Sequence, residues 1–196
     1  MTVEHDINHS FGRQAVSTSQ RRERIRLVFN AVAKRYDLMN DLMSMGIHRL
    51  WKRTLARRTA HISGQVVDLA GGTGDVARLL VRPDRQVTVC DPSLAMMQVG
   101  QSRPGARHIQ WTEGEAEHLP MADASVDLLT ISFGLRNATH VETALAEIHR
   151  VLKPGGHFVC LEFSQPAPWL APFYNLYSFW VIPRLGAFVA REPIDR

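Results

Sequence analysis

Cysteine is scarce in this sequence, and long apolar runs are absent from it. Only two cysteines, Cys90 and Cys160, occur among the 196 residues. Both sit in apolar, strand-like runs, so we expect small buried side chains rather than a disulfide scaffold or a thiolate metal site. No stretch reaches the roughly 20 apolar residues that a membrane-spanning helix needs. The N-terminal residues contain no apolar core of a secretory signal, so we expect a cytoplasmic protein.

Negative charge is sparse in the N-terminal third of the chain. Residues 1–60 carry 12 Lys and Arg against 5 Asp and Glu, whereas residues 61–196 carry 11 against 14. The net charge of +4 is therefore the sum of a basic segment and a slightly acidic one, and we expect the two to face different partners. The hydrophobic fraction of 45% indicates a globular chain, and its length suits one α/β domain.

Hydrophobic periodicity divides the chain into helices and strands. Apolar residues recur at helical spacing over residues 21–36, and a basic helix is expected over residues 47–60, with Leu50, Trp51 and Leu55 on its apolar side. Five short, mostly apolar strands are expected at residues 65–70, 86–90, 108–112, 126–133 and 157–163. Helical stretches between them predict an α/β fold, a parallel Rossmann-like sheet with helices on both faces.

The best-marked helix is expected to run from residue 138 or 139 to residue 152. Thr139 and Glu142 form a capping-box pattern at its start. The sequence Pro154-Gly155-Gly156 is expected to end this helix before the fifth strand begins.

A strand that leads into glycines and then into a helix is the first chemical signal. Residues 66–75 read Val-Val-Asp-Leu-Ala-Gly-Gly-Thr-Gly-Asp. Glycines there lack the Cβ that would keep a ligand away from backbone amides at the helix N-terminus. The segment from Gly72 to Ala77 also fits the loose dinucleotide pattern G-x-G-x-x-G/A, which by itself indicates only some nucleotide.

Two aspartates narrow the choice of nucleotide. Asp91 ends the second strand, about 20 residues beyond the glycines, where a carboxylate accepts hydrogen bonds from both ribose hydroxyls. Asp68 lies inside the first strand, at a position that is ordinarily apolar in dinucleotide sites, and its negative charge suits the ammonium group of a methionine moiety. The pair favours S-adenosylmethionine. The alternatives are that loop amides hold Asp68 and that Asp91 caps the helix that begins near Ser93.

Four motifs in a fixed order extend over most of the chain. They are Tyr36-Asp37-Leu38-Met39-Asn40 with Ser44, His48 and Trp51; Asp68 to Asp75, with alanine at position 70; Ser132-Phe133-Gly134-Leu135-Arg136-Asn137; and Arg150 to Gly156 with Leu161-Glu162-Phe163-Ser164. Together they resemble the ubiquinone/menaquinone biosynthesis C-methyltransferase family.

The resemblance implies a class I, S-adenosylmethionine-dependent methyltransferase. Its reaction transfers a methyl group to a ring carbon of a polyprenylated quinol, either a demethylmenaquinol or a methoxylated benzoquinol. The ring carbon is nucleophilic only when the neighbouring phenolic oxygen loses its proton, so the site must stabilise phenolate and align the carbon with the sulfonium methyl. No metal is expected, because the sulfonium is already activated.

The resemblance also implies a cofactor site. The glycine loop would hold the methionine end, Asp91 the ribose, and Glu115 with Ala116 the adenine. The expected cofactor-binding residues are Asp68, Gly71, Gly72, Thr73, Gly74, Asp91, Glu115, Ala116 and Ser132. The neighbouring acids Glu113 and Glu117 are expected to be solvated.

On the substrate side, Arg136 and Asn137 follow the fourth strand, where a parallel sheet opens its crevice. Arg136 would stabilise a developing oxyanion or polarise a water, and Asn137 would orient the ring. Water would carry the proton, because arginine remains protonated. The alternative for Arg136 is an ion pair with a nearby carboxylate. Tyr36, Asp37 and His48 are the remaining candidate catalytic residues, and a packed side chain is the alternative for His48.

The basic N-terminal segment favours attachment to the inner face of an anionic membrane, where a quinol with an isoprenoid tail resides. Basic helices that are merely solvated are the alternative. Nucleic acid is not expected, because the fourth strand is followed by Ser-Phe-Gly-Leu-Arg-Asn rather than by the motif of amino-group nucleic-acid methyltransferases. Residues 167–182 hold six of the 15 aromatic residues. They would line a prenyl channel, lie on a bilayer or fill the core.

The C-terminal part departs from the family pattern. Methyltransferases of this class resemble one another in a sixth and an antiparallel seventh strand, and no such pair is evident after the fifth predicted strand. We expect one domain with a basic helical cover (1–60), a cofactor-binding core (61–165) and a shortened aromatic segment (166–196). An open fifth-strand edge would favour a homodimer or a quinone-biosynthesis complex. Two alternatives to an active methyltransferase stay open: an impaired fragment that binds the cofactor or a partner, and an NAD-dependent oxidoreductase.

Overall fold

The computed structural model describes residues 46–162 continuously. Before them it describes residues 10–11, 14–15, 20, 23–24, 27, 33, 40–41 and 44. Tyr36, Asp37 and the aromatic C-terminal segment lie outside the described residues, so the expectations for them stay predictions. The same holds for the expected absence of strands after the fifth one.

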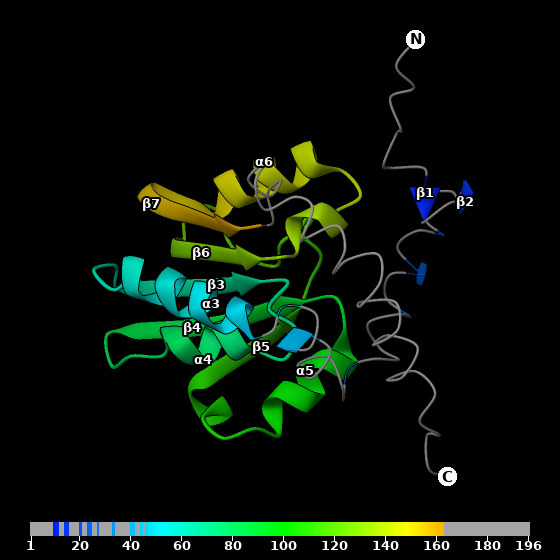
Figure 1. Cartoon of the computed structure of the whole chain (residues 1–196). Helices are drawn as coiled ribbons and strands as arrows, with labels where there is room; N and C mark the ends of the chain where they lie inside the picture. The colour runs from blue at the N-terminus through cyan, green and yellow to red at the C-terminus, as the bar shows by residue number, and fades with distance from the viewer. Residues whose placement is uncertain are drawn as a thin grey trace, which may run out of the picture.

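A five-stranded parallel sheet forms the centre of the described fold (Figure 1). Its strands are β3 (Gly64–Leu69), β4 (Arg85–Asp91), β5 (Ile109–Glu113), β6 (Val126–Ser132) and β7 (Leu152–Leu161), in the spatial order β5-β4-β3-β6-β7. The central strands are runs of Val, Leu and Ile that are buried on both faces, as parallel sheets require. The five predicted strands are confirmed.

Helices cover both faces of the sheet, as predicted. Apolar side chains of α3 (Ile47–Arg58), α4 (Asp75–Leu80) and α5 (Leu94–Gln101) pack on one face, and those of α6 (Val141–Val151) pack on the other. Two short 3-10 turns, η3 (Ala106–His108) and η4 (Leu135–Asn137), and an antiparallel pair, β1 (Ser10–Phe11) with β2 (Gln14–Ala15), complete the described elements. Among the helices of the described residues, none is long and apolar enough to span a membrane.

The side of helix α3 that packs against the core is not the side predicted from its apolar residues. Leu55 is buried, but Leu50 and Trp51 are 57% and 39% exposed. The predicted apolar side is therefore wrong for two of its three residues. The side chains that α3 buries, at helical spacing i, i+4 and i+7, are His48, Lys52 and Leu55.

Helix α6 is capped by a residue far away in the sequence. Its N-cap is His140 rather than Thr139, and no side chain of the cap itself accepts a hydrogen bond. The Glu117 carboxylate, in the loop after β5, accepts hydrogen bonds from the backbone N–H of Thr139 (2.6 Å) and of His140 (3.2 Å). The predicted capping box of Thr139 with Glu142 is therefore wrong. The prediction that Glu117 is merely solvated is wrong as well, because its carboxylate accepts hydrogen bonds from the amides at the start of α6.

The sequence Pro154-Gly155-Gly156 lies inside β7 and not between helix and strand as predicted. The pairing of β6 with β7 shifts register between Val126 and Leu128, which accommodates the extra residues. Gly155 takes a φ of 80°, a conformation that glycine adopts without strain.

The two cysteines differ in their surroundings. Cys90 is buried in β4, as expected, and burial raises the pKa of its thiol to about 12. Cys160 is exposed, so its predicted burial is wrong. Its strand, β7, lies at the edge of the described sheet, where fewer side chains cover it.

Candidate functional site

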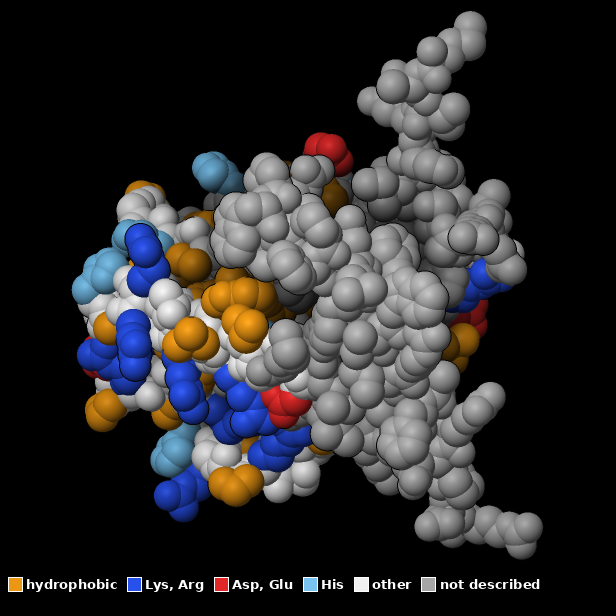
Figure 2. Space-filling view, in the orientation of Figure 1, with side chains coloured by type: hydrophobic (Ala, Val, Ile, Leu, Met, Phe, Trp, Pro, Cys, Tyr) orange, Lys and Arg blue, Asp and Glu red, His pale blue; other side chains and the backbone are white. Residues whose placement is uncertain are grey.

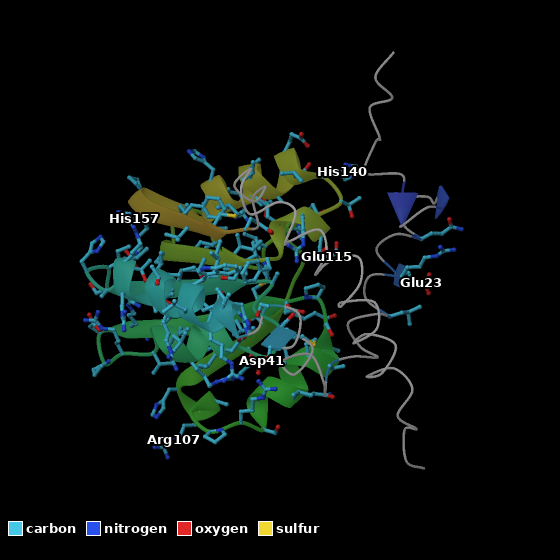
Figure 3. The ribbon with its side chains drawn as sticks, viewed as in Figure 1. Glu23, Asp41, Arg107, Glu115, His140 and His157 are labelled. Atoms are coloured by element: carbon cyan, nitrogen blue, oxygen red, sulfur yellow. The ribbon has the colours of Figure 1, made fainter. Side chains whose placement is uncertain are left out.

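A cavity of about 430 Å³ opens at the carboxyl ends of β3, β4 and β6. Strand β3 lies between β4 and β6 in the sheet. The chain passes from β3 to β4 and then to β5 in one direction across the sheet, whereas β6 and β7 follow in the opposite direction from β3. Loops that leave neighbouring strands in opposite directions separate at such a switch point and leave a crevice between them. Glu115 lies at this end of the sheet and His157 at the opposite end (Figure 3).

Carboxylates dominate the charge of the cavity. Among the described residues, the lining contains one cationic side chain, Lys52. The acidic lining residues are Glu23, Asp68, Asp75, Asp91, Glu115 and Glu117. Opposite charges are attracted strongly where protein excludes water, so this lining favours a cationic ligand over an anionic one.

Asp68 is the most deeply buried of these acids, at 1% exposure. Its Oδ1 accepts a hydrogen bond from Thr130 Oγ1 on β6 (2.8 Å), and its Oδ2 accepts one from the Ala77 N–H in the first turn of α4 (3.0 Å). Burial raises the pKa of Asp68 to about 7, and the two hydrogen bonds limit the rise. The alternative that loop amides hold Asp68 is thus only partly met, because its partners are one amide of α4 and one threonine hydroxyl. Asp68 lines the cavity as well.

Asp91 joins the glycine loop to the start of α5. Its Oδ2 accepts a hydrogen bond from the Gly72 N–H and its Oδ1 accepts one from the Ser93 N–H, both at 2.8 Å. Burial raises the pKa of Asp91, while these two bonds act against the rise. Ser93 is itself the N-cap of α5. Asp91 therefore supports the helix start, as the alternative proposed, and each of its oxygens keeps a second lone pair at the cavity lining.

Gly71 and Gly72 line the cavity. A Cβ on Gly71 would lie 2.9 Å from the Asp68 Oδ2, and a Cβ on Gly72 would lie 3.0 Å from the Met96 Cε. The absence of side chains at these two positions therefore allows the loop to pack closely against Asp68 and Met96, and the predicted contact of its backbone with a ligand stays a prediction.

The structure does not bring Thr73 and Gly74 to the cavity. Thr73 is buried, and its hydroxyl accepts a hydrogen bond from the Arg103 side chain (3.2 Å). Gly74 has a φ of 71°, and a Cβ there would lie 2.7 Å from a ring carbon of Trp111. Thr73 and Gly74 therefore fix the conformation of the loop through their contacts with Arg103 and Trp111.

A matched pair of glycines separates this packing role from backbone conformation. Gly155 has a similar φ of 80°, but no atom lies within 4 Å of a Cβ placed there. Gly155→Ala should lower the free energy of unfolding by about 1–2 kcal/mol, the cost of a left-handed alanine. Gly74→Ala should lower the free energy of unfolding by the same amount and by about 1–3 kcal/mol more, because the new Cβ overpacks against Trp111. Urea denaturation measures both, and equal losses would contradict the packing role.

Ser132, the last residue of β6, carries an unsatisfied hydroxyl. Among the described residues, its Oγ is the one buried side-chain nitrogen or oxygen without a hydrogen-bond partner. Buried polar atoms in native proteins are ordinarily paired, so a water or a polar ligand in the cavity would satisfy this hydroxyl. Ser132 lines the cavity, as do Glu115 and Ala116.

The structure separates the two residues that follow β6. Asn137 lines the cavity, but Arg136 does not. The Arg136 side chain is 50% exposed, and its Nη1 lies 3.1 Å from the Glu162 Oε2. This ion pair is the alternative that the sequence left open for Arg136.

His48 lies behind the cavity rather than in its wall. Its ring is buried, with Nδ1 2.6 Å from the Ser44 Oγ and Nε2 3.7 Å from the Asp41 Oδ1. Burial and the neighbouring Lys52 lower its pKa. His48 lines a smaller surface hollow beside α4, an arrangement that favours the packed-histidine alternative.

One partly buried ion pair in the site was not predicted from the sequence. Lys52 Nζ on α3 donates a hydrogen bond to Asp75 Oδ2 at the start of α4 (2.6 Å), and both residues line the cavity. Burial acts to raise the pKa of Asp75, but the bond with Lys52 holds it below its ordinary value. The signal that could have found Lys52 is its spacing from His48 and Leu55, which places all three on one helical face.

Comparison with known proteins shows the family to which the sequence belongs. The model of the ubiE/COQ5 methyltransferase family matches residues 17–195. The ubiquinone/menaquinone biosynthesis C-methyltransferase UbiE of Rubrivivax gelatinosus is 66% identical over 95% of this chain and 74% of its own length. The protein of the same name from Caulobacter vibrioides is 46% identical over 93% of this chain and 78% of its own length.

The fold has counterparts among solved structures. A Methanococcus maripaludis protein, described as a candidate S-adenosyl-L-methionine-dependent methyltransferase, superposes with a TM-score of 0.61. It is 21% identical, and the match covers 81% of this chain and 74% of that protein. The two proteins therefore share the Rossmann-like fold, a parallel sheet with helices on both faces. By its sequence along nearly its whole length, this chain belongs to the ubiE/COQ5 methyltransferase family and is a methyltransferase.

Proposed function

We propose that the chain transfers the methyl group of S-adenosylmethionine to a ring carbon of a polyprenylated quinol. The observation that carries the proposal is the acid-lined cavity at the ends of β3, β4 and β6. The names of the relatives from Rubrivivax gelatinosus and Caulobacter vibrioides support the quinol as substrate.

The residues in the cavity fit a cationic nucleoside. Asp91 would accept hydrogen bonds from the ribose hydroxyls through its remaining lone pairs, and Asp68 would attract the methionine ammonium group. The open backbone at Gly71 and Gly72 would accommodate the methionine end, and the unsatisfied Ser132 Oγ would gain a partner. Glu115 and Ala116 would lie against the adenine.

The same lining disfavours a nicotinamide dinucleotide. A pyrophosphate would place its negative charges against Asp68 and Asp75 at the glycine loop, where Lys52 is already paired. Titration calorimetry with each cofactor tests this distinction. We expect S-adenosylmethionine to bind and NADH to bind much more weakly, and the reverse order would overturn the proposal.

The chemistry requires little beyond positioning and charge. When bound, S-adenosylmethionine supplies an activated methyl group, which bonds to the ring carbon while the carbon–sulfur electron pair remains on S-adenosylhomocysteine. The phenolic proton leaves through water before this step, and the proton on the methylated carbon leaves afterwards to restore the aromatic ring. The protein must hold the ring in line and stabilise the phenolate.

Arg136 and Asn137 would act on the substrate from η4. The ion pair of Arg136 with Glu162 is half-exposed and therefore weak, so a quinol oxygen could take the place of the carboxylate. Asn137, in the cavity wall, would orient the ring. Tyr36 and Asp37 remain candidates on the N-terminal side, whose Glu23 reaches the cavity lining.

The pKa of Asp68 predicts a pH dependence of cofactor affinity. Because burial raises this pKa to about 7, Asp68 takes up a proton as the pH falls below 7 and then no longer attracts an ammonium group. The cofactor's own amino group stays protonated below about pH 7.7. Affinity for S-adenosylmethionine should therefore be about tenfold weaker near pH 5.5 than at pH 7.

Calorimetry across this pH range checks the expectation, with Asp68→Asn as the control. The asparagine does not titrate, so the variant should bind weakly and with little dependence on pH. An equally steep pH dependence in the variant would assign the titration to another group.

The basic face of the described fold supports peripheral attachment to an anionic membrane. Arg53, Arg57 and Arg58 of α3 are exposed, and Figure 2 shows Lys and Arg gathered on this side of the molecule. Co-sedimentation with phosphatidylglycerol vesicles, but not with phosphatidylcholine vesicles, is the expected result. Equal sedimentation with both would contradict an electrostatic attachment.

A further inference from the structure

The ring of Phe133 lies at the meeting point of two elements that carry positive charge. Phe133 follows β6 with a φ of 59°, a strained conformation for a non-glycine residue, and it lines the cavity. Its ring centroid lies 6.3 Å from that of Trp51, 5.9 Å from Lys52 Nζ and 6.0 Å from the Arg136 Cζ. The strain is retained at a place where an aromatic surface and two cations converge.

Lys52 differs from the exposed arginines of its own helix. It is 6% exposed, and its ammonium group is held at the cavity wall by Asp75. An ammonium group has three N–H donors, of which the bond to Asp75 uses one. As far as the described residues go, Lys52 makes no other hydrogen bond, which leaves two donors for a ligand in the cavity, beside the aromatic surface of Phe133.

The proposed reaction needs such a donor, because the quinol oxygen must become negative before the ring carbon can attack. Arg136 approaches from outside the lining and is bound to Glu162, whereas Lys52 is already inside it. We propose that Lys52 is a catalytic residue whose ammonium group donates a hydrogen bond to the quinol oxygen and stabilises the phenolate. This inference rests on the proposed function, since it names the group that activates its substrate.

The charged groups around Lys52 determine how strongly its ammonium group can stabilise a phenolate. Asp75 on α4 neutralises part of its charge, and Asp68 on β3 acts in the same direction. The other titratable or cationic groups near this cluster, among the described residues, are Asp41 before α3, His48 and Arg49 on α3, Arg78 on α4 and Arg136 on η4. A phenol bound beside Lys52 should have its pKa lowered by about 2, a hundredfold shift toward phenolate, as is typical for an adjacent opposite charge.

A coloured phenol measures this shift without turnover. An ortho-prenylated para-nitrophenol absorbs visible light only as phenolate, so a pH titration of the probe bound to the protein with S-adenosylhomocysteine gives its pKa directly. Wild-type protein should lower the probe's pKa, and Lys52→Arg should retain most of the shift. Lys52→Met should return the probe's pKa to the value in water or above it, because the remaining charges of the lining are negative. Lys153→Met is the matched control, because Lys153 forms a similar ion pair with Asp127 (2.8 Å) away from the cavity lining.

Asp75→Asn separates a charge effect from a purely structural ion pair. If Lys52 acts on the phenolate, this variant should lower the probe's pKa further, because the ammonium charge is no longer neutralised. If the pair only fastens α3 to α4, Asp75→Asn and Lys52→Met should change the probe in the same direction, which would overturn the inference. A wild-type protein that leaves the probe's pKa unchanged would also overturn it.

Methyl transfer to a short-chain demethylated quinol distinguishes this inference from the proposed function. Lys52→Met should lower kcat about a hundredfold at neutral pH and recover at high pH, where the quinol ionises by itself. Wild-type transfer with an unaltered pH profile in Lys52→Met would refute the role of Lys52 alone. A wild-type protein that lowers the probe's pKa but transfers no methyl group would refute the proposed function alone.

Discussion

Asp91→Ala should reduce the affinity for S-adenosylmethionine at least about a hundredfold, because the two charge-assisted hydrogen bonds that we propose to the ribose would be lost at a buried site. The same change removes the acceptor for the Gly72 and Ser93 N–H groups, so the glycine loop also loses its link to α5. Both effects act in the same direction on binding. Titration calorimetry measures the dissociation constant.

Glu113→Ala is the matched control for Asp91. Glu113 ends β5 and pairs in register with Asp91, but its side chain is exposed and does not line the cavity. Its removal should leave the dissociation constant within about twofold, as is usual for a surface change remote from a ligand. Asp91→Asn helps to distinguish the loss of the proposed ribose hydrogen bonds from the loss of support for the glycine loop. Its amide oxygen can still accept a hydrogen bond from one of the two backbone N–H groups. Unchanged affinity in folded Asp91→Ala would show that the ribose assignment is wrong.

Arg136→Gln should lower kcat for a short-chain demethylated quinol about a hundredfold while the affinity for S-adenosylmethionine stays the same. Removal of one donor to a developing oxyanion ordinarily costs about 100–1,000-fold in kcat. The cofactor affinity should not change, because Arg136 lies beyond the cavity lining that Asp68, Gly72 and Asp91 form. Initial rates and calorimetry on the same preparation separate the two quantities.

Arg107→Gln provides the comparison for Arg136. Arg107 is exposed in η3, at the lower edge of the molecule in Figure 3 and away from the cavity. We expect its kcat to equal that of the wild type. If Arg136→Gln also keeps the wild-type kcat, the role of Arg136 is structural, as in its ion pair with Glu162, which is the alternative from the sequence.

The strands were predictable from the sequence because burial on both sheet faces requires continuous apolar runs. The start of α6 was not. Its amides are capped by Glu117, which is 22 residues away from Thr139 in the chain, and no local pattern reveals such a partner. A distant partner also explains the wrong expectation for Thr73. Its position in the glycine loop predicts contact with a ligand, but its hydroxyl accepts a hydrogen bond from Arg103, which follows α5.

The substrate side was harder to predict than the cofactor side. Asp68 and Asp91 were identifiable because carboxylates interrupt or end apolar strands. Lys52 was not identified, since a lysine among arginines on a basic helix ordinarily remains solvated. Its burial depends on Asp75, a residue that only the packing of α3 against α4 brings near. The basic segment therefore contributes one of its charges to the acidic cavity, which composition alone could not show.

Methyl transfer itself tests the central claim most directly. The chain is incubated with S-adenosylmethionine labelled in its methyl group and with a short-chain demethylated quinol, and the products are separated and identified. We predict a label on the ring carbon beside a phenolic oxygen, with S-adenosylhomocysteine formed in equal amount. Bound S-adenosylmethionine with no labelled quinol, or a label on oxygen instead of carbon, would contradict the account.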